Sequence, residues 1–495
     1  MGNVFGSILP YYGQIYRKRK VDDCEKCSDS EDNDDFMRTP KRRKLMSTSQ
    51  YIYKTLFLQG QNSDITIVAL SQEWKLHKVY LCQSPYFSSM FCGSWREAEE
   101  GIITVGIEDP NVTANALKIV FGSLYQDEVL IEPAEVVPVL STATLFQLDG
   151  MIQQCAEIML ETINLQTVLL YYEAAERYGL KKVAEKSFEW LLRNLMIKIQ
   201  ESAPQLRQIN TELMTKLISS PELIVMQTEF SIYILLKTWI FVHENPSWDG
   251  NMKAFLLEAH KCVHETSNTS SKLLFTKERG KSFLETESGE PYLPAFRALR
   301  SQHLVNHHLD VELLDSDQIV PKSWFLPVFK TQWYTMLRVD QGVDRGPKQI
   351  AQEEFDSQCL RCARKLISDG QHIWRWTGFN FGLDLVVTYH MRCVRFRRNQ
   401  RNDSERYIPS IQPCRRHLMY RLTIYSLDKQ GHATYTATTG LKTLTLAKNE
   451  EVKVLNLDKD CPFPIVVSAN FLVTTPLHSP NSSRQHSPVR NAKDS

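Results

Sequence analysis

Residues 78–95 read KVYLCQSPYFSSMFCGSW, and they decide how the first globular part of the chain folds. Ser84 suits a helix N-cap and Pro85 suits the first helical position, whereas Gly93 tolerates the left-handed conformation that ends a helix. The stretch therefore predicts two short helices that are separated at Ser84-Pro85 and end at Gly93. It is rich in aromatic residues and closes on Trp95, so it is expected to pack into a core or to meet a partner.

The segments on either side of this stretch carry strand and helix signals. SDITIVAL (63–70) and IITVGI (102–107) have the apolar pattern of strands. ANALKIVFGSLY (114–125) and GMIQQCAEIML (150–160) repeat apolar residues at helical spacing. Early strands followed by helices indicate an α+β domain.

The next part of the chain contains only helical signals, up to about residue 270. They are LQTVLLYYEAAERYGL (165–180), LKKVAEKSFEWLLRNL (180–195) and EFSIYILLKTWI (229–240). Their apolar residues recur at three and four positions, which predicts an array of helical hairpins. Residues 271–350 carry mixed signals.

From about residue 371 the apolar period becomes two. HLMYRLTIY (417–425) alternates clearly, and turn residues separate it from HATYTATT (432–439) and LKTLTLA (441–447). Several short strands with turns between them predict an antiparallel sandwich or barrel.

The composition is that of a soluble globular protein of about three domains. The chain has 495 residues and a formal net charge of +1, so no global field attracts nucleic acid or a membrane. Eleven cysteines, without a signal peptide, indicate free thiols in a reducing compartment. The most apolar long stretch, residues 231–242, is too short to span a bilayer and contains Lys237.

Both ends of the chain, residues 1–48 and 479–495, are predicted to be disordered because they contain few apolar residues. A basic run in the first tail fits a nuclear import signal, and it consists of Lys41, Arg42, Arg43 and Lys44. Thr39 and Ser487 each precede proline, as proline-directed kinases require. Gly2 fits N-myristoylation, which would give the chain its only membrane contact, and an unmodified N-terminus fits equally well.

Four stretches resemble a BTB domain: SDITI (63–67), LHKVYL (76–81), SPYFSSMF (84–91) and FGSLYQDEV (121–129). YYEAAERYGL (171–180) and EFSIYILLKTWI resemble helices of a BACK domain. Because STSQYIYKTLFLQGQNSDI (47–65), IWRWTGFNFGLDLVVTY (373–389) and the β-rich end fit as well, the chain resembles the germ cell-less family of BTB proteins. The fold class implied is multidomain. It comprises an α+β BTB domain (49–163), an all-α BACK domain (164–270), a mixed helical linker region (271–350) and a β-rich, sandwich-like substrate-binding domain (351–478).

The resemblance implies a cullin-3 docking surface on the BTB domain. Trp95, Arg96 and Glu97 correspond to a segment that packs against the cullin in such proteins, where a hydrophobic residue is followed by any residue and then Glu. Tyr125 corresponds to a further residue of that surface. The alternative is that the aromatic residues around the segment belong to the core, which we expect for Phe87 and Phe91.

The resemblance also implies a homodimer. Asp64 and Lys78 correspond to the paired charges in the groove of dimeric BTB domains. The alternative for these two residues is an ordinary carboxylate at the end of a strand and a solvated lysine.

No arrangement of residues predicts catalysis, a cofactor or a metal site. Cys24 with Cys27, and Cys359 with Cys362, each have the spacing of half a zinc site but lie too far apart in the chain to complete one. In the stretch from His260 through Cys262 to His264, the two imidazoles could share one helical face, but they have no carboxylate or third ligand within reach, which favours surface histidines. The arginine-rich stretch MRCVRFRRNQR (391–401) suits a solvent-facing strand first, an acidic or phosphorylated protein segment second and nucleic acid third. We expect no nucleic-acid binding.

The resemblance implies a non-catalytic substrate adaptor of a cullin-3 RING ubiquitin ligase. The BTB homodimer would bind cullin-3, and the C-terminal domain would hold a protein substrate near the transfer machinery. The family also implies a nuclear location, at the nuclear envelope or nuclear matrix, and a role in germ-cell formation or spermatogenesis. The alternative is a nuclear BTB scaffold or transcriptional co-regulator without ligase activity.

Overall fold

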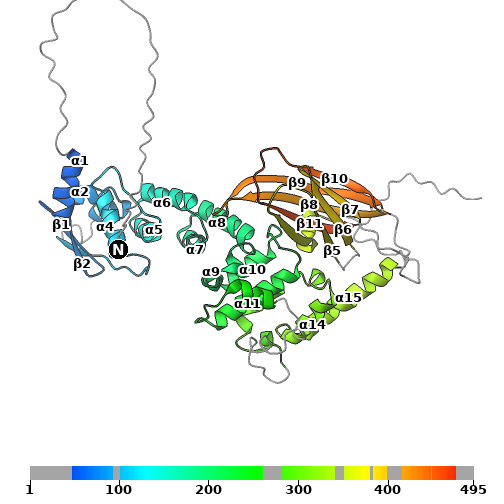
Figure 1. Cartoon of the computed structure of the whole chain (residues 1–495). Helices are drawn as coiled ribbons and strands as arrows, with labels where there is room; N and C mark the ends of the chain where they lie inside the picture. The colour runs from blue at the N-terminus through cyan, green and yellow to red at the C-terminus, as the bar shows by residue number, and fades with distance from the viewer. Residues whose placement is uncertain are drawn as a thin grey trace, which may run out of the picture.

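Figure 1 shows the computed structural model of the chain, which describes residues 47–92, 101–259, 281–340, 350–378, 383–398, 415–447 and 449–474. A small sheet with its helices leads into a helical array, and two larger sheets follow (Figure 1). None of the helices in these ranges is long and apolar enough to cross a membrane.

The N-terminal domain is built on a three-stranded sheet of order β2-β1-β3. Its strands are β1 (Ile65–Ala69), β2 (Gln72–Leu76), antiparallel to β1, and β3 (Ile102–Thr104), parallel to β1. Alternate residues of β1 are buried, as the two-residue period of a strand requires. The helices are α1 (Thr48–Tyr51), which continues into the π-helical η2 (Ile52–Leu58), α2 (Lys78–Leu81), α3 (Pro85–Cys92), α4 (Ala114–Ser123), α5 (Val136–Leu145) and α6 (Asp149–Glu161). The predicted α+β organisation of this domain is confirmed.

The break between α2 and α3 falls where the sequence predicts it. The Ser84 hydroxyl accepts a hydrogen bond from the N–H of Phe87 at 3.4 Å, which caps α3, and donates to the carbonyl of Phe146 at 2.6 Å. Phe87 is fully buried, and its ring centroid lies 5.0 Å from that of Phe146. Phe87 is therefore a core residue, as expected, and Phe91 packs against the same cluster while partly exposed.

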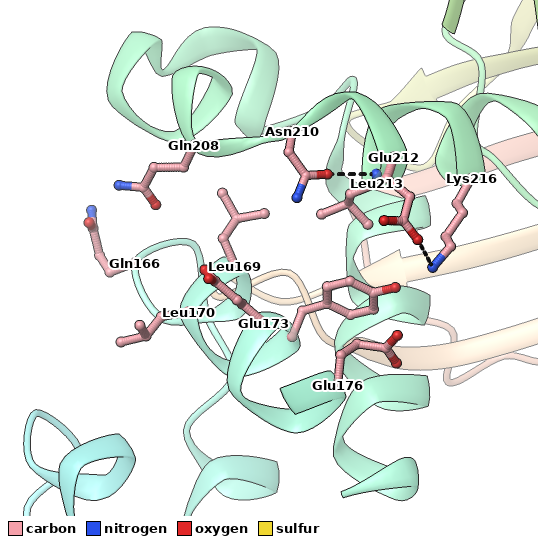
Figure 2. Close-up of a pocket in the computed structure, with 11 residues that line it drawn as sticks. Gln166, Leu169, Leu170, Glu173, Glu176, Gln208, Asn210, Glu212, Leu213 and Lys216 are labelled. Carbon is pink, nitrogen blue, oxygen red and sulfur yellow. Dashed lines mark hydrogen bonds and ion pairs between the residues drawn. The ribbon is translucent and has the colours of Figure 1, made fainter. Parts of the chain in front are cut away.

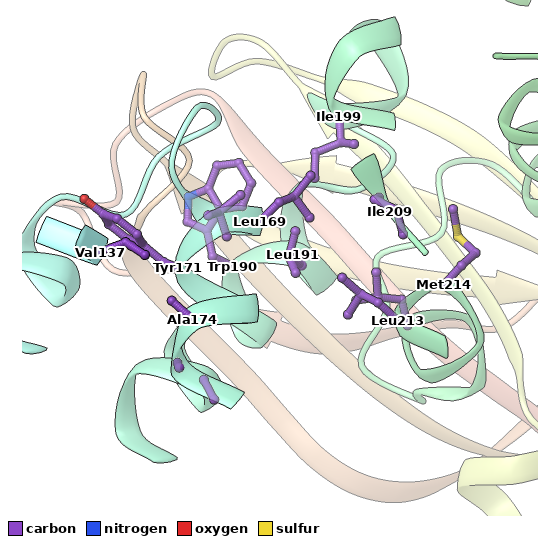
Figure 3. Packing of buried hydrophobic residues seen from close by; sticks show 14 of the residues in the cluster. Val137, Leu169, Tyr171, Ala174, Trp190, Leu191, Ile199, Ile209, Leu213 and Met214 are labelled. Carbon is purple, nitrogen blue, oxygen red and sulfur yellow. The ribbon is translucent and has the colours of Figure 1, made fainter. Parts of the chain in front are cut away.

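A helical array follows. It consists of α7 (Val168–Tyr178), α8 (Lys181–Asn194), η4 (Ile199–Glu201), α9 (Ala203–Gln208), α10 (Thr211–Ser219), α11 (Phe230–Glu244) and α12 (Met252–Ala259). Gly179 ends α7 with a φ of 76°, in the left-handed region that favours glycine. Every residue of α11 from Phe230 to Val242 is buried, so this helix forms the centre of the array. Figure 3 shows Leu169, Trp190 and Leu191 packing toward Leu213 and Met214.

Residues 281–340 are predominantly helical and attach to α11. They form η7 (Phe283–Glu285), η8 (Glu290–Tyr292), α13 (Leu293–Arg297), η9 (Ser301–His303), α14 (His308–Asp317) and α15 (Lys322–Asp340). Asp317, at the end of α14, accepts hydrogen bonds from the Lys237 ammonium at 2.6 Å and the Tyr233 hydroxyl at 2.9 Å. Burial raises the pKa of Asp317, and the Lys237 charge opposes that shift. This buried cluster fixes the segment to the array.

The C-terminal part contains two four-stranded antiparallel sheets, of orders β10-β7-β6-β5 and β4-β11-β8-β9. After α16 (Gln352–Gln358), the strands are β4 (Leu360–Leu366), β5 (His372–Gly378), β6 (Leu383–His390), β7 (Cys393–Arg398), β8 (Arg415–Leu427), β9 (Ala433–Ala447), β10 (Glu451–Asn456) and β11 (Ile465–Thr474). Phe396 of the first sheet contacts Tyr420 and Phe471 of the second, with 5.5 Å between ring centroids in each pair. The two sheets therefore share one core.

The alternation predicted for β8 is confirmed, since its inward-facing residues are all buried, namely Leu418, Tyr420, Leu422 and Ile424. Two details differ from the sequence pattern. The strands begin at Leu360 rather than near residue 371, and residues 433–447 form one long strand rather than two. Gly440, with a φ of 63°, allows β9 to continue through an irregularity in its pairing with β8.

A buried ion pair joins the second sheet to the helical array. Arg361 on β4 donates two parallel hydrogen bonds to Glu229, the N-cap of α11, at 2.8 and 2.9 Å. Its remaining nitrogen donates to the carbonyls of Ile218 and Ser220, both at 2.7 Å. The two side chains are only 1% and 0% exposed. Burial opposes the charge on Glu229, but the Arg361 guanidinium outweighs it and lowers the pKa of Glu229 below its usual value.

The tip of the β8–β9 hairpin forms a second contact with the helices. The Asn194 amide on α8 donates to the carbonyl of Gly431 at 2.9 Å. Nε2 of His432 lies 2.6 Å from the carbonyl oxygen of Ile163, between α6 and α7. Gly431 has a φ of 98°, and a Cβ there would lie 2.6 Å from Oδ1 of Asn194, so the position favours glycine. The tip thus ties the C-terminal sheets to the joint between the N-terminal domain and the array.

Replacing Glu229 with glutamine should destabilise the fold strongly, because Arg361 would remain buried without a counter-charge. We expect the free energy of unfolding, measured by denaturant titration at pH 7, to fall by about 3–5 kcal/mol. The matched control is Glu212→Gln, which breaks an exposed ion pair with Lys216 and should leave the transition almost unchanged.

The pH dependence gives a second test of the same pair. Because folding lowers the pKa of Glu229, its charge stabilises the fold above the unfolded value of about 4.3, and the stabilisation is lost as the pH falls through the folded value. The parent chain and Glu229→Gln should therefore converge in stability as the pH falls below about 4. Equal stability at pH 7 would contradict the role of the pair.

Candidate functional site

The segment predicted to dock cullin-3 lies between α3 and β3. Trp95, Arg96 and Glu97 fall within residues 93–100, outside the described residues, and so does Gly93. The same holds for the tail sites, namely Gly2, Thr39, Lys41, Arg42, Arg43, Lys44 and Ser487. These assignments stay predictions.

Tyr125 is buried, with only 3% of its surface exposed, and this differs from the docking contact expected of it. Its hydroxyl accepts a hydrogen bond from the N–H of His77 at 2.9 Å and lies 3.2 Å from Nδ1 of the same residue. Its ring centroid is 4.3 Å from that of Tyr80. Burial raises the pKa of Tyr125 to about 12, so the phenol is neutral at physiological pH. Tyr125 therefore holds the start of α2 from inside the domain.

The structure brings Asp64 and Lys78 together at the start of α2. The Asp64 carboxylate accepts the backbone N–H of Lys78 at 2.8 Å, which satisfies a free donor in the first turn of the helix. The Lys78 ammonium lies 5.5 Å from the ring centroid of Phe91, within the range of a cation–π contact. Asp64 itself is exposed. The two residues thus present a carboxylate and an ammonium group near one helix end.

Exposed apolar side chains of the same domain are further candidates for partner contact. They are Val79 on α2 (73% exposed), Ile102 on β3 (62%), Tyr51 on α1 (55%) and Leu58 on η2 (53%). Sequence patterns did not single these residues out, because a short helix or strand has too few positions to reveal which apolar side chain lies outside.

A groove lies between α7 and α10 (Figure 2). It consists of two adjoining hollows of about 490 and 650 Å³, which share Tyr172, Glu176 and Lys216. The Glu212 carboxylate lies 2.9 Å from the Lys216 ammonium, and that hydrogen bond lowers the pKa of Glu212. Neither hollow is lined by a histidine or a cysteine. The groove offers carboxylates and apolar surface for binding, and its residues were not predicted because two helices must pack to form it.

The cysteine pair predicted to be free thiols is buried. Sγ of Cys359 lies 3.0 Å from an Arg300 nitrogen and 3.2 Å from the Asn470 amide nitrogen, and Sγ of Cys362 lies 3.7 Å from the carbonyl oxygen of Ala469. Burial raises the pKa of the Cys362 thiol. In the described part of the chain, no group of three His, Cys, Asp or Glu side chains is placed to hold a metal ion. The other candidate ligands lie outside that part, namely Cys24, Cys27, His260, Cys262 and His264.

The arginine-rich stretch begins with a turn at Met391 and Arg392 and continues as strand β7. Arg395 and Arg397 alternate with the buried residues Val394 and Phe396, as the solvent-facing strand interpretation requires. Arg395 lies directly opposite Lys453 on β10. Arg397 lies opposite Glu451 on the same strand. The outer side of this sheet therefore carries charges of both signs, and nucleic-acid binding by it stays the least favoured interpretation.

Replacing Tyr125 with phenylalanine should destabilise the N-terminal domain, because the buried N–H of His77 would lose its acceptor. We expect a loss of about 1–3 kcal/mol in the free energy of unfolding. The matched control is Tyr51→Phe, since Tyr51 is 55% exposed and should tolerate the change. An unchanged stability of Tyr125→Phe would show that water or another group replaces the hydroxyl.

Comparison with known proteins identifies the family to which the chain belongs. Residues 53–163 match the BTB/POZ domain family. The chain is 46% identical to human Germ cell-less protein-like 1, over 89% of this chain and 84% of that protein. It is 41% identical to Protein germ cell-less of Drosophila melanogaster, over 98% of this chain and 87% of that protein. The similarity thus extends far beyond the BTB/POZ domain, and the chain belongs to the germ cell-less family of BTB proteins.

Proposed function

We propose that this chain is a substrate adaptor of a cullin-3 RING ubiquitin ligase, with no catalytic group of its own. The observation that carries the proposal is a BTB/POZ domain joined through a packed helical array to a separate pair of sheets. BTB domains generally mediate dimerisation and cullin-3 binding. An adaptor contributes by holding its client close to the transfer machinery, so it needs no catalytic group of its own.

In this proposal the cullin contact follows α3. Trp95 would supply an aromatic anchor and Glu97 a charge, while Arg96 lies between them. The stacking of Phe87 on Phe146 supports the proposal because it fixes the helix that leads into this segment. Truncation of an interface tryptophan typically costs about 2 kcal/mol or more of binding free energy.

The client would be held by the C-terminal sheets. Two contacts support this part of the proposal because they fix the sheets to the rest of the chain: the buried pair of Arg361 with Glu229, and the His432 contact with the carbonyl of Ile163. A client bound there would keep a defined position relative to the BTB domain. In a BTB homodimer, two such arms would raise the apparent affinity when both engage together.

The cellular part of the proposal rests on the family and on the N-terminal tail. Relatives that carry the name germ cell-less support a role in germ-cell formation or spermatogenesis. The basic run from Lys41 to Lys44 supports entry into the nucleus, with the nuclear envelope or matrix as the site of action.

Calorimetric titration of the full chain with the N-terminal region of cullin-3 tests the adaptor function. We expect tight binding by the parent chain and a loss of at least about thirtyfold in affinity for Trp95→Ala/Glu97→Lys, because the anchor and the charge are both removed. Leu130→Ser is the control, since Leu130 is 86% exposed in the same domain.

Each outcome of the titration decides between functions. No binding by the folded parent would contradict the ligase proposal and favour the nuclear scaffold. Equal binding by the parent and the double variant would agree with the adaptor function but show that other residues form its interface with cullin-3.

Sedimentation equilibrium tests the dimer. Asp64→Asn keeps an oxygen that accepts the N–H of Lys78, so the start of α2 should stay intact while the charge is lost. We expect the dimer dissociation constant to rise about tenfold, which corresponds to about 1.4 kcal/mol. Glu73→Gln, on β2 of the same sheet, is the control. An unchanged dissociation constant would contradict the assignment of Asp64 to the dimer groove.

A further inference from the structure

Helix α15 exposes a stripe of large apolar side chains on one side. Leu326 is 65% exposed, Trp333 and Tyr334 are each 61% exposed, and Leu337 is 40% exposed. Their positions are 7, 8 and 11 residues after Leu326, so with 3.6 residues per turn they lie on one face of the helix. Four such side chains within twelve residues form a patch rather than the scattered single exposures that are ordinary on protein surfaces.

The opposite face of α15 is firmly packed, so the stripe does not result from a loose helix. Phe325, Gln332 and Thr335 are 8%, 4% and 8% exposed. The Gln332 amide donates to the carbonyl of Gln302 at 3.0 Å, which fixes the helix to η9. The Arg297 guanidinium lies 3.3 Å from the ring centroid of Trp324 near the start of the helix. One face of α15 is thus part of the fold, and the other is free.

The charge on the free face is positive. Lys330 is exposed and lies four residues after Leu326 and three before Trp333, in the middle of the stripe. Within the described part of the chain, no carboxylate is within ion-pair distance of its ammonium, whereas Lys322 binds Asp315 at 3.2 Å. Asp340, the last residue of α15, is the only acidic residue in the sequence of the helix.

We propose that this stripe is a docking surface for an amphipathic helix of another protein that carries a carboxylate opposite Lys330. The exposed face from Leu326 to Leu337 is about 16 Å long, so a partner helix of three to four turns would cover it. The apolar side chains would be buried between the two helices, and the carboxylate would neutralise Lys330. The stripe lies on a different segment of the chain from the proposed cullin contact and from the strands, and it goes beyond the proposed function.

The position of Lys330 selects this occupant over two others. A helix that lies on a membrane keeps its apolar face uninterrupted and places its lysines on the polar face, whereas Lys330 lies within the apolar stripe. A second copy packed antiparallel about a two-fold axis at the middle of the stripe would place two Lys330 ammonium groups against each other. A partner helix with a carboxylate needs no uninterrupted apolar face and places no like charge against Lys330.

Fluorescence anisotropy with two labelled helical peptides tests the proposal on the full chain. Both peptides have about 18 residues and a leucine stripe at helical spacing, and they differ only in whether glutamate or lysine flanks that stripe. We expect the parent to bind the glutamate peptide about tenfold more tightly than the lysine peptide. Lys330→Glu should reverse this preference, and Trp333→Ser should weaken both peptides about tenfold or more.

The control is Leu257→Ser, because Leu257 is 69% exposed on another helix and should not affect either peptide. Thermal unfolding shows whether each variant is folded, and Lys330→Glu changes only an exposed group. Equal binding of both peptides by the parent, or a preference that Lys330→Glu leaves unchanged, would overturn the proposal. If the parent sediments with anionic vesicles and Trp333→Ser does not, the occupant of the stripe is a membrane surface instead. If the parent self-associates and Trp333→Ser does not, the occupant is a second copy of this chain.

Discussion

The pair of Arg361 with Glu229 is the interaction on which the arrangement of the chain depends. Both side chains are removed from water, and a buried guanidinium tolerates that only when a counter-charge and acceptors surround it. Glu229 supplies the counter-charge, and the carbonyls of Ile218 and Ser220 supply the remaining acceptors. The end of α10, the start of α11 and strand β4 must therefore meet in one geometry, because any other placement leaves a charge buried without a partner.

Other polar contacts surround this pair and extend the same constraint. Arg300, from residues 281–340, donates to the backbone carbonyl of Asp356 at 2.6 Å, and the His303 ring lies 2.6 Å from the carbonyl oxygen of Gln358. The helical segment, the array and the second sheet thus converge on one place. Apolar contacts alone would allow these parts to slide, whereas hydrogen bonds with fixed directions specify one arrangement. In the proposed adaptor, this arrangement would decide where a client lies relative to the BTB domain.

Local features were predictable from the sequence, and contacts between distant segments were not. The break at Ser84-Pro85 follows from cap chemistry, and the buried face of β8 follows from its two-residue period. Arg361 gave no such signal, because a charged residue in a strand usually faces solvent and its partner lies 132 residues earlier.

Tyr125 was assigned to a docking surface by resemblance, yet its hydroxyl accepts a hydrogen bond from His77 inside the domain. The stripe of α15 lay in a segment of mixed pattern, where Pro327 interrupts the expected spacing of a helix. The predicted docking segment at Trp95 stays a prediction.

The hairpin tip at Gly431 has a consequence for the order in which the protein is made. His432 contacts the carbonyl of Ile163 across 269 residues, and Arg361 reaches Glu229 across 132. At a synthesis rate of roughly 5–20 residues per second, roughly 7–26 s pass between the synthesis of Glu229 and that of Arg361. The interval between Ile163 and His432 is longer still. The N-terminal domain and the array can fold and pack in that interval through their shared apolar core. The C-terminal sheets can be attached to them at Ile163 only after the β8–β9 hairpin has emerged. A chain released before that hairpin would retain the BTB domain and the array but lack the contacts of Gly431 and His432 that fix the C-terminal sheets.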